Sequence, residues 1–84
     1  MLQNIRIILI NTSHPGNIGS AARAMKTMGL TDLVLVDPIK FTPGEPNEHA
    51  DAMASGASDV LHGARVVATF EEAIEDVAVV MGAS

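Results

Sequence analysis

The stretch IRIILINTSHPGNIGSAAR, residues 5–23, decides the fold of this 84-residue chain. It opens with an apolar run over residues 5–10 that only Arg6 interrupts. Such a run is typical of a parallel strand buried on both faces. Turn-forming residues 12–16 follow, and Asn17 then stands where a helix N-cap is expected, with Gly29 at the helix end. The apolar residues that recur at helical spacing between them are Ile18, Ala21, Ala22, Met25 and Met28.

The rest of the chain repeats this alternation of strand and helix. The expected elements are a strand at 33–36, a loop at 41–46, helices at 47–54 and 58–61, a strand at 65–68, a helix at 69–76 and a strand at 77–81. Asn47 is the expected N-cap of the 47–54 helix and Gly56 its end, and Thr69 with Glu72 forms a capping box. The pattern predicts an α/β fold, a Rossmann-like parallel sheet with crossover helices, as one domain over residues 1–84.

The composition restricts the class of protein. Hydrophobic residues make up 48% of the chain and charged ones 18%, so a disordered chain is excluded. Only two residues are aromatic, which predicts an aliphatic core with Met25, Met28 and Met53 as filler. The absence of cysteine excludes disulfides and thiolate chemistry. We expect a soluble, cytoplasmic protein without a membrane segment or a metal site, and with His49 and His62 at the surface.

Charge is distributed unevenly along the chain. Residues 1–40 carry four basic side chains and two acidic ones, a net charge of +2. Residues 41–84 carry one basic side chain and eight acidic ones, a net charge of −7. The overall charge of −5 argues against a general nucleic-acid binder, and any anion site is expected in the first half.

The turn into the first helix is the expected anion site. A helix start presents unpaired backbone N–H groups and the positive end of the helix dipole. Gly16 and Gly19 would let a phosphate or sugar approach the backbone, and Arg23 lies off the apolar face with a side chain that leans toward this turn. The alternative is that Gly19 only allows close packing and that Arg23 is a solvated surface residue.

Two other functions stay open from the residues alone. Asp37 ends the second strand where a dinucleotide-binding fold holds a ribose, which would make the chain a mononucleotide- or dinucleotide-binding domain. Position 14 would then need the first glycine of the Gly-x-Gly-x-x-Gly pattern, and His14 stands there. The acidic second half is instead compatible with a non-catalytic dimerisation module.

The segment Asn17-Ile-Gly-Ser-Ala-Ala-Arg23 resembles the first signature motif of the SPOUT-class RNA 2′-O-methyltransferases, and within them the TrmJ branch of the TrmH group. The resemblance extends through residues 1–6, 12–16, 23–30 and 54–61. It implies a Rossmann-like half followed by a C-terminal trefoil knot. The knot and the family's second and third motifs would lie after Ser84, so this chain would be the N-terminal part of a SPOUT domain and inactive alone.

The resemblance also implies a function and a site. Members are homodimers that use S-adenosylmethionine to methylate a ribose 2′-hydroxyl, in this branch within the tRNA anticodon loop. Asn17 and Arg23 are the implied catalytic residues. The residues expected to bind the RNA substrate are Ser13, His14, Gly16, Gly19 and Lys26. The residues expected at the rim of the cofactor site are Gly82, Ala83 and Ser84.

Overall fold

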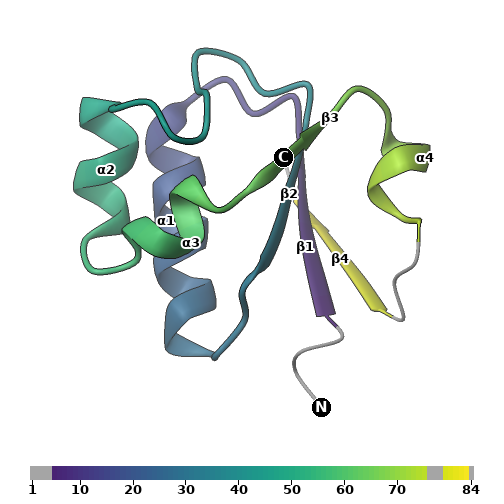
Figure 1. The fold of residues 1–84 in the computed structure, drawn as a ribbon, viewed down its shortest axis with the longest axis horizontal. Helices are drawn as coiled ribbons and strands as arrows, with labels where there is room; N and C mark the ends of the chain where they lie inside the picture. Colours follow the sequence, from purple (N-terminus) through teal and green to yellow (C-terminus); the bar gives the residue numbers. More distant parts are fainter. Residues whose placement is uncertain (1–4, 76–78, 84) are drawn as a thin grey trace.

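The helices of the protein lie on both faces of one parallel sheet, with α1, α2 and α3 on one side and α4 on the other (Figure 1). This computed structural model describes residues 5–75 and, for the backbone, 79–83. The elements are β1 (Ile5–Ile10), α1 (Pro15–Thr27), β2 (Asp32–Val36), α2 (Glu48–Ala54), α3 (Ser58–His62), β3 (Arg65–Val67), α4 (Phe70–Ala73) and β4 (Val79–Ala83). The strand order is β3-β2-β1-β4. The predicted α/β fold with crossover helices is confirmed.

The two central strands are buried on both faces, as their continuous apolar sequences predict. Leu9 of β1 and Leu35 of β2 are paired in register and pack against α1. Ile8 and Val34 point the other way, toward Ala73 of α4. All five are at most 5% exposed. The core is aliphatic as expected, because side chains alternate between two apolar layers and β1 and β2 supply both.

Arg6, the one charged residue of β1, is buried for a structural reason. Its Nη1 donates to the carbonyl oxygens of Ala73 (2.7 Å) and Glu75 (2.9 Å), and its Nε donates to the Asp32 carboxylate (2.9 Å). A buried charge is tolerated when it is paired and hydrogen-bonded, and a cation is favoured at a helix C-terminus. Arg6 thereby fastens the end of α4 to the sheet.

The end of α1 is a Schellman motif. Gly29 adopts a φ of 75°, its N–H donates to the Lys26 carbonyl, and the Leu30 N–H donates to the Met25 carbonyl at 2.8 Å. Met25 and Leu30 are both buried, which confirms Gly29 as the terminating residue. The expected burial of Met28 is wrong, because the helix ends at Thr27 and the chain folds back to bury Leu30 instead.

Several boundaries differ from the sequence pattern. Asn47 caps α2 as expected, accepting from the Ala50 N–H, but Ser55 rather than Gly56 takes the positive φ after it. The Thr69 cap of α4 is confirmed, yet α4 ends at Ala73 rather than at residue 76. The carbonyls of Ala73 and Glu75 at this end accept hydrogen bonds from Arg6. The last strand is later than expected, at 79–83, and residues 76–78 lie outside the described part.

In the described part of the chain, every helix is too short or too polar to cross a membrane.

Helices α1 and α2 meet backbone to backbone. Gly19 is buried, and a Cβ built on it would lie 2.1 Å from the carbonyl oxygen of Ala50. Backbone cannot swing aside as a side-chain end can, so only glycine allows this approach. Gly19 thus serves close packing, against α2 rather than against the sheet.

We predict that Gly19→Ala destabilises the protein by about 3 kcal/mol, the upper part of the range for overpacked sites, because the new methyl group meets backbone. Urea denaturation monitored by circular dichroism measures the change. Gly56→Ala is the matched control, since nothing lies within 4 Å of its added Cβ. Equal stability of the two variants would contradict the packing argument.

Candidate functional site

The chain leaves β1 and β2 at the same edge of the sheet in the same way. Asn11 and Asp37 follow the two strands directly, with φ values of 51° and 47°. The Asn11 N–H donates to the Val36 carbonyl (2.9 Å), and the Asn11 side-chain amide donates to the Asp37 carboxylate (3.2 Å). Ligands of parallel α/β sheets bind at the carboxyl ends of the strands. The two loops that leave this edge therefore start from a fixed, hydrogen-bonded pair.

Helix α1 starts three residues earlier than the sequence predicted, so the assignment of Asn17 as N-cap is wrong. Pro15 occupies the first helical position, where its fixed φ fits and its missing N–H costs nothing. His14 is the N-cap residue, and its side chain makes no capping hydrogen bond. The Asn17 N–H donates to the His14 carbonyl (2.9 Å), and the Asn17 side chain is exposed in the first turn. Asn17 is thus available for a ligand.

The loop before α1 combines exposed and buried polar groups. Ser13 and His14 are exposed. Thr12 is only 4% exposed, and its hydroxyl has no hydrogen-bond partner among the described residues. The Thr12 carbonyl accepts from the Ile39 N–H at 3.1 Å, which holds the loop base against the segment after β2.

Arg23 lies on the exposed side of α1, off the buried face, as the sequence predicted. Within the described residues, its guanidinium has neither a hydrogen-bond nor an ion-pair partner. It is six residues from Asn17, about 9 Å along the helix axis at the standard rise. Ser20, which sequence reasoning missed, stands between them at i+3 from Asn17 and i−3 from Arg23. The three polar side chains form an oblique stripe on α1.

Lys26, an expected substrate contact, forms an ion pair with α3. Its Nζ contacts the Asp59 carboxylate of α3 at 2.6 Å, and this hydrogen bond is the main reason that the pKa of Asp59 lies below its ordinary value. Lys26 is nine residues from Asn17, about 13 Å along the axis. The structure therefore separates Lys26 from the start of α1, and it also places Gly19 beneath α2.

A hollow of about 370 Å³ opens beside the first turn of α1. Its lining residues are His14, Pro15, Gly16, His49, Ala52 and Met53. Gly16, an expected substrate contact, thus lies at a surface cavity. Met53 is 47% exposed, which corrects its expected role as core filler: it extends over Gly16, whose built Cβ would lie 3.4 Å from the Met53 Cγ. The exposed His49 is confirmed as a surface residue.

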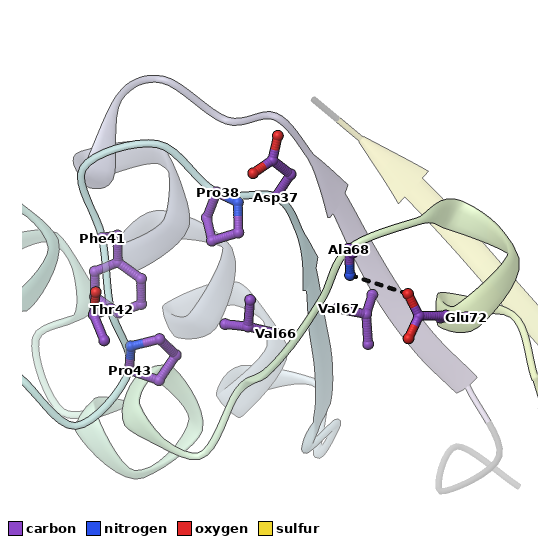
Figure 2. Close-up of a pocket in the computed structure, with 9 residues that line it drawn as sticks. All are labelled: Asp37, Pro38, Phe41, Thr42, Pro43, Val66, Val67, Ala68 and Glu72. Atoms are coloured by element: carbon purple, nitrogen blue, oxygen red, sulfur yellow. Dashed lines mark hydrogen bonds between the residues drawn. The ribbon is translucent and has the colours of Figure 1, made fainter.

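A larger hollow, of about 530 Å³, lies beyond the carboxyl ends of β2 and β3 (Figure 2). It is lined by Asp37, Pro38, Phe41, Thr42, Pro43, Val66, Val67, Ala68 and Glu72. Asp37 and Glu72 stand at its rim on different segments, and the Glu72 carboxylate accepts from the Ala68 N–H at 3.3 Å (Figure 2). Two carboxylates in a mainly apolar hollow disfavour a phosphate ligand.

One wall of this larger hollow is held by His62, which is not the plain surface residue that the sequence predicted. Its side chain is 25% exposed. Its Nε2 lies 2.6 Å from the Asp51 carboxylate, and its Nδ1 accepts from the Gly44 N–H at 2.9 Å. The Asn47 N–H, followed by His62, holds the pKa of Asp51 below its ordinary value. Asp51 and His62 together fix the 41–46 loop.

The remaining predicted site residues lie at the end of β4. Gly82 pairs with Ile8 and Ala83 with Leu9, so both belong to the strand and approach the edge from which the Ser13–His14 loop leaves. Ser84 lies outside the described residues. No three His, Asp or Glu side chains gather into a possible metal site within the part that the structure describes.

We predict that the Asp51 network makes folding stability depend on pH. A carboxyl whose pKa is lower in the folded chain stabilises it fully above the unfolded value of about 4, and this contribution disappears as the pH falls through the folded pKa. Asp51→Asn should lower the free energy of unfolding at pH 7. It should also make this free energy fall less steeply as the pH is lowered from about 5 to about 2. Urea denaturation across that range measures both, with Glu45→Gln as the control for the loss of one negative charge. A decline as steep in Asp51→Asn as in the original chain would contradict the assignment.

Comparison with known proteins adds relatives that resemble the chain along its length. The SpoU rRNA methylase family matches residues 4–82. The tRNA (cytidine/uridine/adenosine-2′-O-)-methyltransferase TrmJ of Pseudomonas aeruginosa is 60% identical over 84 residues, which are all of this chain and 31% of that protein. The chain therefore spans about a third of the length of the curated relatives that it matches.

Solved structures give the same result. A probable methylase family protein from Haemophilus influenzae superimposes with a TM-score of 0.77 at 56% identity, over 90% of this chain and 30% of that one. TrmJ from Z. mobilis superimposes with a TM-score of 0.74 at 49% identity, over 84% of this chain and 30% of that one. Both sequence and fold therefore align with the same group of proteins.

Proposed function

The chain belongs to the SpoU rRNA methylase family, and on this premise we propose that it forms part of a tRNA 2′-O-methyltransferase. The proposed reaction transfers a methyl group to a ribose 2′-hydroxyl. The observation that carries the proposal is the polar stripe on α1, in which Asn17 and Arg23 are exposed and Ser20 between them is half-buried. The names of the relatives, as tRNA (cytidine/uridine-2′-O-)-methyltransferases, support tRNA as the substrate class. Methylation in the anticodon loop, a homodimer and a cytoplasmic location are parts of the proposal that rest on the motif resemblance.

The proposed cofactor is S-adenosylmethionine, which supplies the methyl group as an electrophilic carbon when bound. Gly82 and Ala83 are the described residues that would contribute to its rim, because β4 ends beside β1 at the carboxyl edge of the sheet. Small residues there leave room for a ligand close to the backbone. The rest of such a pocket would come from residues beyond this third of the relatives' length.

Arg23 is proposed to hold the RNA phosphate and to stabilise negative charge on the 2′-oxygen. A guanidinium remains protonated in proteins, so it serves poorly as the base. Its planar fork matches a phosphate with two hydrogen bonds, and charge that develops in the transition state is stabilised by a donor fixed in advance. The hydroxyl proton then passes to a phosphate oxygen or to water. Asn17 orients Arg23 or the ribose from the preceding turns of the helix.

We predict that Arg23 is required for activity in a chimera in which this chain replaces the matching residues of the Pseudomonas aeruginosa relative. Arg23→Ala should lower kcat for tRNA methylation by about 100-fold or more, the loss typical of removing one transition-state donor. Arg65→Ala, which removes an exposed arginine of β3, is the control and should leave kcat unchanged. Full activity of Arg23→Lys would contradict the role of the guanidinium fork, and full activity of Arg23→Ala would contradict the site.

We also predict a difference in cofactor binding. Isothermal titration calorimetry with S-adenosylmethionine should detect binding to the chimera and none to the 84-residue chain, because the chain supplies only one rim of the site. If the chimera binds no cofactor while its fold is intact by circular dichroism, the assignment of this chain to the reaction is wrong.

A further inference from the structure

The hollow beside the first turn of α1 joins two parts of the chain that are distant in sequence. His14, Pro15 and Gly16 come from the turn into α1, whereas the opposite wall belongs to α2. The residues on that second wall are His49, Ala52 and Met53. The α2 residues belong to none of the motifs that the sequence analysis singled out. Their place in this hollow follows from the close contact of α1 and α2 at Gly19.

The larger and the smaller hollow described above differ in charge. Asp37 and Glu72 put two carboxylates on the larger one, whereas none of the residues that line the smaller one is acidic. This difference stands out in a chain with ten acidic residues and a net charge of −5. The smaller hollow also lies at the positive end of the α1 dipole, so a polyanion is tolerated there.

The surface chemistry of the smaller hollow suits a flat, polarisable ring. It offers two exposed imidazoles, from His14 and His49, the ring of Pro15, and the thioether of the 47% exposed Met53. Bases of single-stranded RNA are bound by stacking on aromatic side chains, histidine among them, and the methionine thioether makes favourable contacts with aromatic rings. The volume of about 370 Å³ falls within the range of small-molecule sites.

We infer that this hollow receives a nucleobase of a single-stranded segment of the RNA substrate, stacked against His49 and Met53 of α2. The inference rests on the proposed function and adds the part of the substrate that α2 contacts. Pro15 and Arg23 are eight residues apart, about 12 Å along the axis, and the arginine side chain leans back toward the helix start. One RNA strand can therefore place a phosphate at Arg23 and a base in the hollow.

The test compares two oligoribonucleotides of the same length and charge, one with pyrimidine bases and one abasic, in NMR titrations of the chain. The base-bearing oligomer should bind about tenfold more tightly, as expected for one stacked base. Met53→Ala and His49→Ala should abolish this difference, whereas Arg23→Ala should weaken both oligomers alike. Met28→Ala is the matched control: this methionine is 49% exposed at the other end of α1 and should change nothing.

The base site and the proposed function give different results when they are wrong. If Met53→Ala and His49→Ala retain the full preference for bases while Arg23→Ala weakens binding, the base site is wrong and the proposed function stands. If neither oligomer binds the original chain, both the base site and the RNA-binding role fall. Because His49 and Met53 are exposed, their replacement leaves the core intact, which the NMR spectra of the free variants verify.

Discussion

The close contact between the backbones of α1 and α2 is the constraint on which the rest of this structure depends. Gly19 is the point of contact, and a side chain there would meet the carbonyl of Ala50. The contact buries Ile18 and Ala22 of α1 together with Ala54 of α2, and so builds the larger core. It also sets α2 beside the first turn of α1, where the smaller hollow forms. A packing requirement thus determines which side chains surround the candidate site.

The sequence could predict most elements, because their signals are local. Continuous apolar runs identified β1 and β2, and side-chain caps identified the starts of α2 and α4 at Asn47 and Thr69. The start of α1 was misplaced because two local signals competed. Asn17 is a good capping residue, but Pro15 at the first helical position determined the boundary.

The remaining errors share a cause, since each depends on a contact between residues far apart in the sequence. Arg6, for whose burial the sequence analysis made no prediction, is likewise buried by carbonyls that lie 67 and 69 residues away. His62 meets Asp51 and Gly44 only because α3 packs beside the 41–46 loop. Met53 was expected in the core because methionine usually fills gaps, yet α2 turns it toward the surface at Gly16. Periodicity within one helix cannot reveal which helix covers it.

Arg23 differs from two other cations of the first half because it forms no ion pair with the described residues. Arg6 is paired with Asp32 and Lys26 with Asp59, so two of the cations of the basic first half are committed to structure. Arg23 remains exposed on α1, on the side that the core does not use. A free guanidinium on an acidic protein attracts polyanions only over a short range at physiological salt. Affinity for RNA must then come from several contacts at close range, and a stacked base beside α2 supplies one that salt does not screen.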